Sequence, residues 1–453
     1  KIIMTKSQDL TKGTLWKQML LFFFPIAVGT LFQQLYNAVD AIIVGKYVGT
    51  GALAAVGGTP AVFINLLISV FVALTGGATV TISQFYGAGR KKELEKATGT
   101  AVTFCVLLGL VLTVICMPAT DLVLRIMGTP ADTVADAKTY LMIYLAGTVV
   151  MLLLNMESGI LRAVGDSRTP LIFMIISCLS NIALDLLFVI RFHLGVAGVA
   201  YATVIAEIIN ATLLTVKLIR TKEPYRITAK GLGLEKGLIK EMLRIGIPAA
   251  LQGGVYAISN MILQAAINSL GTAVVAAWAL TGKVDGFYWG VGAAAGTTIT
   301  TFAGQNFGAG NRERVEETAK TGAKLFIPMT LLVCAFLLLL GKKMLPLFTD
   351  DPAVVDLAYY MMWFFVPFYF LWTMIEILSG TLRGCGDVKI PTLITILGVG
   401  VFRIIWIGTV CRMWPGVETT AIVYGISWVF TSIALLIYYR KNKDRILGQQ
   451  ISA

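Results

Sequence analysis

Two stretches of the chain decide the fold: GILRAVGDSRTP at residues 159–170 and GTLRGCGDVKIP at residues 380–391. Each has the order Gly-x-Leu-Arg-x-x-Gly-Asp, with a proline four residues after the aspartate. The two stretches lie 221 residues apart. A motif that returns once at such a distance indicates that the chain is built from two homologous halves.

A second pair of motifs keeps the same spacing. Gln84 precedes a Gly-Ala-Gly turn at residues 87–89, and Gln305 precedes another at residues 308–310. Both turns are followed by basic residues and are typical of tight connections between helices. The duplication therefore extends along each half and is not confined to one motif.

The composition places both halves in a membrane. Hydrophobic residues make up 57% of the 453-residue chain and charged residues only 14%, with a mean hydropathy of +0.80, which excludes an ordinary soluble domain. Apolar runs long enough to cross about 30 Å of hydrocarbon predict an all-α integral membrane protein with twelve transmembrane helices, six in each half. The expected spans are residues 16–39, 51–78, 97–118, 134–157, 169–190, 196–219, 239–268, 273–301, 319–340, 354–379, 389–411 and 416–439.

The basic residues predict the topology of these helices. Most of them lie at the two termini and in alternate loops, whereas the opposite loops contain only Lys46, Arg125, Lys138, Arg191, Lys342, Lys343 and Arg412. The positive-inside rule places the richer set, and hence both termini, in the cytoplasm. The net charge of +12 is explained by topology and by contact with the lipid bilayer, and it requires no nucleic acid.

Six helices per half is an even number, so both halves enter the membrane from the same side. We expect a parallel repeat with a pseudo-two-fold axis along the membrane normal, around a central cavity. The N-terminal lobe would comprise residues 1–219 and the C-terminal lobe residues 240–453. The hydrophilic residues 220–239 would form a cytoplasmic linker. The first apolar run does not have the form of a cleavable signal peptide.

Several chemistries find no support in the sequence. The six cysteines lack metal-ligand spacing, and the single histidine, His193, falls in a short loop. No Gly-Lys-Ser/Thr loop for a nucleotide phosphate is present. We therefore expect no enzyme, no ATP-driven pump, no bound metal and no cofactor.

Ionisable residues inside the expected spans are the candidates for function, because they are costly in hydrocarbon and usually face a cavity or a partner. In the first half, polar residues recur at helical spacing on three spans. They are Gln33, Tyr36, Asn37 and Asp40 in the first span, Asn181 and Asp185 in the fifth, and Thr203 and Glu207 in the sixth. Two carboxyl groups that meet in a low dielectric would share a proton or jointly hold a cation. The alternative is that Asp40 and Asp185 extend to water at the outer interface and that Glu207 makes a structural hydrogen bond.

The second half does not repeat this chemistry. At the 221-residue spacing Asn181 and Asp185 correspond to Phe402 and Trp406. At the spacing of 223 residues between Pro25 and Pro248, Asp40 corresponds to Leu263, so any such cation site belongs to the first half alone. The seventh span instead has a row of polar residues four apart: Gln252, Tyr256, Asn260, Gln264 and Asn268. This row would line a watery path or form hydrogen bonds between helices.

Further ionisable residues lie in later spans of the second half. Asp285, Lys283, Glu376 and Arg403 would either pair across helices, for example Lys283 with Glu376, or contact a substrate. Aromatic residues nearby would suit planar organic cations, although aromatic rows in helices are more often packing.

Taken together, these motifs resemble the multidrug and toxic compound extrusion family, in particular its prokaryotic members. The resemblance is carried by Pro25 followed by QQLYNAVD at residues 33–40, by the paired Gln84 and Gln305, by the duplicated Leu-Arg-x-x-Gly-Asp segments, and by Asn181 with Asp185. It covers essentially the whole chain. One departure is the seventh span, where some relatives have an acidic residue and this chain has none near residues 253–257.

The resemblance implies a transporter of the cytoplasmic membrane that exports small organic, mostly cationic molecules by alternating access, driven by H+ or Na+. It further implies that Tyr36, Asp40, Asn181, Asp185 and Thr203 form the cation site of the first lobe, with Asp40 as the central coupling group. We expect a monomer that contacts its substrates and the lipid bilayer. A substrate cavity would include Gln33, Asn37, Glu207, Gln252, Tyr256, Asn260, Asp285 and Glu376. The alternatives are a flippase for lipid-linked precursors and a passive facilitator.

Overall fold

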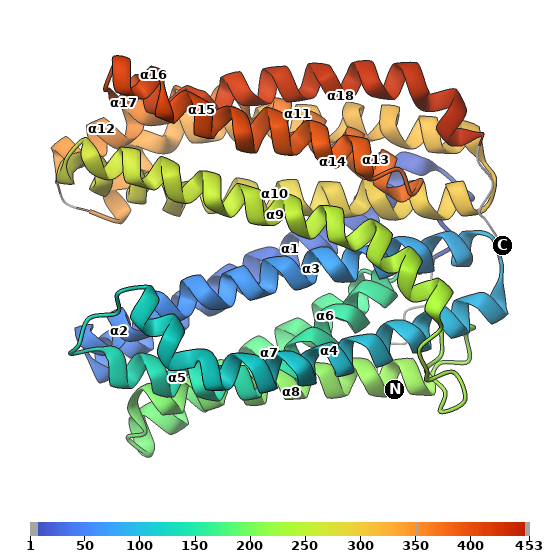
Figure 1. The fold of residues 1–453 in the computed structure, drawn as a ribbon, viewed down its shortest axis with the longest axis horizontal. Coiled ribbons are helices and arrows are strands. Elements are labelled where there is room, and N and C mark those ends of the chain that lie inside the picture. The colour runs from blue at the N-terminus through green and yellow to red at the C-terminus, as the bar shows by residue number, and fades with distance from the viewer. Residues whose placement is uncertain (1–7, 350, 449–453) are drawn as a thin grey trace. The chain divides into compact units, whose positions relative to one another are not determined.

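The chain folds entirely into helices in the part that the computed structural model describes, residues 8–349 and 351–448 (Figure 1). The first half has these elements: α1 (Leu15–Ile43), η1 (Val44–Val48), α2 (Thr50–Gly57), α3 (Thr59–Gly87), α4 (Lys91–Ile126), α5 (Val134–Ala146), α6 (Thr148–Ala163), α7 (Arg168–Asp185), η2 (Leu186–Arg191) and α8 (Gly195–Arg220). Here η1 and η2 are π-helical turns.

The second half begins with three long helices and continues with more broken ones. Its elements are α9 (Lys236–Ser269), α10 (Thr272–Gly308), α11 (Arg312–Met344), η3 (Leu345–Leu347), α12 (Pro352–Met362), η4 (Val366–Phe368), α13 (Tyr369–Gly384), α14 (Lys389–Thr395), η5 (Ile396–Val401), α15 (Phe402–Gly408), α16 (Val410–Met413), α17 (Val417–Ala421) and α18 (Val423–Leu447).

These elements supply the twelve predicted crossings. Among the described residues, nine helical stretches are long and apolar enough to span a membrane, and α5 with α6 forms a tenth, bent by 51° at Gly147. The remaining two are α9 and α10, with 34 and 37 residues, which at 1.5 Å per residue is ample length. Their polar rows lower their hydropathy, which is why composition alone does not select them.

Most helices run past the ends of the expected spans. The span expected at residues 134–157 continues as α6 to Ala163, and α4 begins at Lys91, before the expected residue 97. Charged and polar residues at these ends lower the local hydropathy without interrupting helical hydrogen bonding. An apolar run therefore marks the part of a helix in hydrocarbon and not the whole helix.

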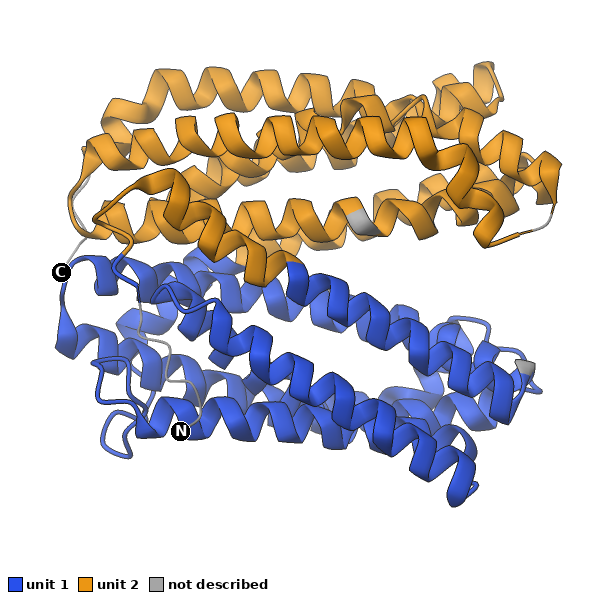
Figure 2. Cartoon of the chain, turned by 180° about the vertical axis from the view of Figure 1, so that it is seen from behind, with its two compact units in different colours: residues 1–9, 28–246 blue, residues 10–27, 247–453 orange. Residues whose placement is uncertain are grey.

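Packing divides the chain into two compact units (Figure 2). Unit 1 comprises residues 1–9 and 28–246, and unit 2 comprises residues 10–27 and 247–453. The chain therefore changes unit inside α1 and again inside α9, in each case within three residues of a proline, Pro25 or Pro248. The two lobes expected from the repeat, residues 1–219 and 240–453, are each a continuous stretch of sequence, and they stay a prediction.

The repeat is visible in backbone conformation. Gly165 and Gly386 occupy the same place in their motifs and have φ values of +87° and +82°. Gly89 and Gly310, also 221 residues apart, have φ values of +66° and +71°. Side chains other than glycine rarely adopt these left-handed conformations, so the glycines of both motifs are required by the turns that end the helices.

The repeat also fixes how helices approach each other within each unit. Gly159 of α6 faces the Thr79 hydroxyl of α3, and Gly380 of α13 faces the Thr300 hydroxyl of α10 in the same way. Small residues at such crossings let helix backbones come close together, which is a main source of helix association in membranes.

The first segment of α1 belongs to the core of unit 2. Phe22 packs edge-on against Phe302, with ring centroids 5.8 Å apart, and Phe23 lies 5.0 Å from Phe326. Preceding α1, Leu10 is fully buried, and its N–H donates to Gln305 Oε1 over 3.2 Å. Gln305 of the repeated motif therefore holds Leu10 in unit 2.

The hydrophilic linker is bound to α4 of unit 1. The Thr228 hydroxyl donates to Glu95 over 2.8 Å, and the N–H groups of Gly233 and Glu235 donate to threonine hydroxyls of α4. Lys96 forms an exposed ion pair with Glu235 at 3.1 Å. These contacts give the linker a fixed course along unit 1.

Two glycines bring α3 and the start of α9 together in unit 1. A Cβ atom on Gly77 would overlap the Met242 carbonyl and lie 2.8 Å from the Gly246 N–H nitrogen, and a Cβ on Gly246 would lie 2.9 Å from the backbone of Leu74. The neighbouring Gly76 faces open space. The crossing therefore depends on Gly77 and Gly246 having no side chain.

We predict that Gly77→Ala destabilises the protein by about 1–3 kcal/mol, because backbone atoms must move to admit the new methyl group. Gly76→Ala is the matched control, and it should leave stability equal or slightly higher, since alanine favours helix more than glycine does. Thermal unfolding of the two purified variants in the same detergent measures the difference. Equal midpoints would contradict the assigned crossing.

Candidate cation and substrate sites

The carboxyl groups of Asp40 and Asp185 meet in the interior of unit 1. Asp40 lies near the end of α1, and Asp185 is the last residue of α7, with its side chain fully buried. The two side chains are within hydrogen-bonding reach of each other. As carboxylates, Asp40 Oδ1 and both oxygens of Asp185 would have no hydrogen-bond donor among the described residues. A proton or a cation between these oxygens would satisfy the pair.

Three other predicted residues surround this pair. Asn181, one turn before Asp185 on α7, is fully buried, and neither its amide nitrogen nor its oxygen has a partner in the described part of the chain. The half-buried Tyr36 lies close to the buried Thr203 of α8. The Thr203 hydroxyl donates to the Val199 carbonyl over 3.0 Å, so its oxygen is free to accept a further hydrogen bond. The structure thus brings together all five residues predicted for the cation site.

The helices that bear the two aspartates change their winding next to them. The π-helical turn η1 begins four residues after Asp40, and η2 follows Asp185 directly. The two turns contact each other within unit 1. Single π-turns are rare and occur often at functional sites.

Glu207 extends the cluster along α8. It lies one turn after Thr203, and its Oε1 accepts a hydrogen bond from the Tyr144 hydroxyl of α5 over 3.3 Å. Tyr140 stacks on Tyr144, with ring centroids 6.2 Å apart, and lies close to Asp40, Asp185 and Glu207. Sequence reasoning did not select the two tyrosines, because aromatic residues one turn apart in an apolar helix are typical of packing. Gln33 and Asn37 of α1 have exposed side chains.

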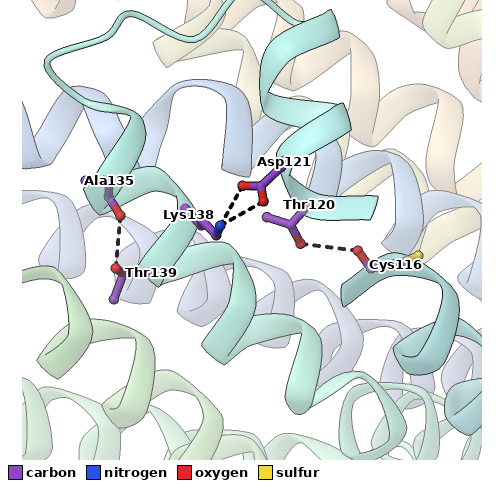
Figure 3. Close-up of polar contacts among 6 residues, drawn as sticks. All are labelled: Cys116, Thr120, Asp121, Ala135, Lys138 and Thr139. Carbon is purple, nitrogen blue, oxygen red and sulfur yellow. Dashed lines mark hydrogen bonds and ion pairs between the residues drawn. The ribbon is translucent and has the colours of Figure 1, made fainter. Parts of the chain in front are cut away.

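An exposed ion pair joins α5, the helix that contains these tyrosines, to α4. Figure 3 shows Lys138 of α5 reaching both carboxyl oxygens of Asp121 on α4, at 2.7 and 2.8 Å. Both side chains are about half exposed or more, so the pair contributes little to stability. Asp121 is therefore an acidic residue of unit 1 that lies in a solvated setting.

Unit 2 contains a cavity of about 250 Å³ with an aromatic wall and one acid. Its lining includes the predicted Asn260 and Asp285, and the aromatic residues Trp278, Trp289, Phe365, Tyr369, Tyr424 and Trp428. Asp285 Oδ2 accepts from Trp289 Nε1 over 2.8 Å, and Oδ1 accepts from the Tyr369 hydroxyl. These donors fix the carboxyl group at the cavity wall.

The other predicted residues of unit 2 lie around Tyr256 of α9. Gln252 Nε2 donates to the Tyr256 hydroxyl over 3.0 Å, and Glu376 of α13 lies close to this tyrosine. Lys283 has an exposed side chain and forms no ion pair with Glu376, so the pairing considered from the sequence is wrong. The reason is direction, since Lys283 faces away from the interior of the unit.

Glu376 fits against a glycine of the neighbouring helix. Its Oε2 occupies the place that a side chain on Gly296 of α10 would need. Arg403 of α15, which is 5% exposed, stacks on the Tyr424 ring at 3.9 Å and donates to the Ser427 hydroxyl over 3.3 Å. Its charge is stabilised by aromatic faces.

The candidate sites contain no conventional metal centre. In the described ranges, no group of three or more His, Cys, Asp or Glu side chains is arranged to hold a metal ion. The unit 1 cluster offers two carboxyls with amide and hydroxyl oxygens instead.

A duplicated, twelve-helix membrane fold with carboxyl groups buried inside one of its units defines a secondary transporter. The family model described as MatE matches residues 25–187 and 248–407, one block in each half. The chain therefore belongs to the MATE family of multidrug efflux transporters. Members of this family are transporters and not enzymes, and the protein is a multi-pass membrane transporter of small molecules.

Comparisons with individual proteins agree with this assignment. The chain is 28% identical over 439 residues to the probable multidrug resistance protein YoeA of Bacillus subtilis, covering 95% of this chain and 94% of that protein. It is 29% identical over 442 residues to the probable multidrug resistance protein YpnP of the same organism, covering 97% and 98%.

Solved structures share the fold. A crystal structure of MATE in complex with MaL6 has a TM-score of 0.91 at 23% identity, covering 98% of this chain and 100% of that one. An outward-facing multidrug resistance MATE family transporter of the MOP superfamily has a TM-score of 0.89 at 24% identity, covering 98% and 99%. The predicted fold class of two six-helix lobes is thereby confirmed.

We predict that Gly296→Ala displaces the Glu376 carboxyl and destabilises the protein by about 1–3 kcal/mol, since the site is closely packed. Gly286→Ala on the same helix is the control, because a methyl group there meets open space. Thermal unfolding of both variants provides the measurement. A Gly296→Ala midpoint equal to that of Gly286→Ala would show that Glu376 does not occupy this place.

Proposed function

We propose that this protein is a cation-coupled antiporter that exports organic cations across the cytoplasmic membrane. The observation that carries the proposal is the contact between the Asp40 and Asp185 carboxyls inside unit 1. Two carboxylates in a low dielectric repel each other unless a proton or cation joins them. A group that must gain a positive charge to be stable is suited to couple ion entry to a change of conformation.

The coupling follows from differential binding. In one conformation the pair is closed, as described here, and holds the ion. In the other the two carboxyls separate into water and release it. An ion that binds one state better than the other shifts the balance between them by that difference. Bending of α1 at or near Pro25 would change the position of Asp40 relative to Asp185.

We favour H+ over Na+ as the coupling ion. A direct contact between carboxyl oxygens suits a shared proton, because an oxygen that carries a proton donates to the other carboxylate. A sodium ion would need to hold the two carboxyls apart and recruit further oxygens, for which Asn181 and Thr203 are available. The transport experiment below distinguishes the two ions.

The aromatic cavity of unit 2 is the proposed substrate site. A cation inside it would face six aromatic side chains and the fixed carboxylate of Asp285. Aromatic faces attract organic cations by about 0.5–2 kcal/mol each, and a cavity with few polar groups tolerates many shapes. Asn260 would add one adjustable hydrogen-bonding group.

Three further features of the working protein remain proposals. Both termini and the linker would face the cytoplasm, as the distribution of basic residues indicates. The protein would work as a monomer, since all proposed site residues come from one chain. If efflux by the wild-type protein responded to neither a pH gradient nor a Na+ gradient, a passive facilitator or a flippase for lipid-linked precursors would be favoured instead.

We predict that Asp40→Asn abolishes ion-driven efflux. Asparagine cannot exchange a proton or supply the negative charge that holds a cation. The measurement is efflux of a fluorescent organic cation from proteoliposomes, with pH and Na+ gradients imposed separately. Efflux by wild type under one gradient names the ion, and efflux by Asp40→Asn at the wild-type rate would overturn the assigned role.

The matched control for this variant is Asp121→Asn. It makes the same chemical change in unit 1, at the exposed ion pair with Lys138. We expect wild-type efflux and a stability within about 1 kcal/mol of wild type. Loss of efflux in both variants would point to a general effect of removing negative charge.

We predict that Asp285→Asn weakens binding of the same organic cation by roughly tenfold, about 1.4 kcal/mol. The reason is the loss of a fixed negative charge at the cavity wall, while the aromatic faces remain. Equilibrium binding to the purified protein, followed by fluorescence polarisation, measures the change. Asp356→Asn, at an exposed ion pair with Lys342, serves as the control. Unchanged affinity in Asp285→Asn would place the substrate elsewhere.

A further inference from the structure

A further carboxyl group lies inside unit 1, apart from Asp40, Asp185 and Glu207. Glu157 of α6 is fully buried. Its Oε1 accepts a hydrogen bond from the Thr215 hydroxyl of α8 over 2.5 Å. Its Oε2 is also buried and has no partner among the described residues. The expected span of residues 134–157 placed this glutamate at the end of its helix, whereas α6 continues to Ala163 and encloses it.

The surroundings of Glu157 supply no positive charge to balance a carboxylate. From α4 it is faced by the buried Cys105, and from α8 by the Thr215 hydroxyl. Contacts with α3, α5 and α7 add no charged group that is recorded near it in the described chain. The only other charged residue on α6 is Arg162, five positions away and therefore on another side of the helix. An ionised carboxyl with one hydrogen bond would leave a charge and a lone oxygen unsatisfied in a buried place.

The hydrogen-bond partner of Glu157, Thr215, lies on α8, the helix that also bears Thr203 and Glu207. Thr203 and Glu207 are four residues apart and lie on the same side of this helix, whereas Thr215 is turned by about 120° from Thr203. At 1.5 Å per residue, Glu207 is about 6 Å and Thr215 about 18 Å from Thr203 along the helix. Thr203 lies close to Tyr36, and hydrogen bonds connect Glu207 to Tyr144 and Thr215 to Glu157. Carboxyl groups therefore occur at three levels of unit 1.

We propose that Glu157 is a second proton-binding site of unit 1, and that it takes up and releases its proton during transport. Glu157 lies toward the end of unit 1 that contains the turn at Gly165, whereas Asp40 and Asp185 lie toward the opposite end. Proton binding neutralises the carboxyl, and Thr215 keeps its hydrogen bond to Oε1 in the protonated form. The carboxylate form is stable only in a second conformation, in which solvent reaches Glu157. The role in transport rests on the proposed proton coupling, whereas proton binding by Glu157 does not.

The first test is infrared spectroscopy of the full-length reconstituted protein at neutral pH. A protonated carboxyl has a carbonyl stretching band that a carboxylate lacks. We expect Glu157→Gln to remove one such band, and Thr215→Val to shift its frequency, because the hydrogen bond to Oε1 is lost. Identical spectra for wild type and Glu157→Gln would show that Glu157 is ionised and would overturn the proposal.

Glu95→Gln is the matched control for both tests. Glu95 of α4 also accepts a hydrogen bond from a threonine, Thr228, over 2.8 Å, but it is only partly buried. We therefore expect Glu95→Gln to leave the protonated-carboxyl bands unchanged. Loss of a band in this variant as well would mean that the spectra do not report on burial.

The second test is efflux driven by a pH gradient in the same proteoliposomes. We expect Glu157→Gln to slow efflux at least tenfold while the aromatic cavity binds its organic cation with wild-type affinity, and Glu95→Gln to transport normally. If Glu157→Gln loses the band and still transports at the wild-type rate, the proton is permanent and the transport role is overturned. If the wild-type protein itself ignores the pH gradient, the proposed coupling fails, and the infrared band alone decides whether Glu157 binds a proton.

Discussion

The structure of unit 1 depends on one electrostatic constraint: two carboxyl groups placed beside each other, that of Asp185 fully buried and that of Asp40 partly buried. Asp40 and Asp185 come from helices that are far apart in the sequence, so the contact exists only when α1 and α7 are packed together. Burying one carboxylate without a donor costs several kcal/mol, and burying two side by side costs more. A proton or cation bound between the two groups would remove this cost, which is why we propose the pair as the site that couples transport to an ion.

Much of this arrangement could be predicted from the sequence. The duplicated Leu-Arg-x-x-Gly-Asp motif correctly indicated two halves, because the left-handed turns at Gly165 and Gly386 impose the same residues on both. The spacing of Asn181 and Asp185, and of Thr203 and Glu207, placed each pair on one helix face. Helical periodicity is local, so it survives without knowledge of the tertiary fold.

What could not be predicted depends on contacts between helices. Glu157 was overlooked because an apolar run ends where charge begins, while a helix continues as long as its hydrogen bonds do. Tyr140 and Tyr144 have no signal in sequence that separates a hydrogen-bonded tyrosine from a packed one. The pairing of Lys283 with Glu376 was wrong because matching charges say nothing about direction, and Lys283 faces outward. In each case the missing information was which side of one helix meets which side of another.

The division of the chain into units has a consequence for how the protein can be built. Residues 10–27 from the first half belong to unit 2, and residues 236–246 from the second half belong to unit 1. Each half thus gives its leading segment to the other, as in a domain-swapped dimer joined into one polypeptide. A break in the linker would leave two fragments that each lack a piece of their own unit and carry a piece of the other. Neither half alone therefore contains all the residues of one unit, even though each contains a complete copy of the repeated motif.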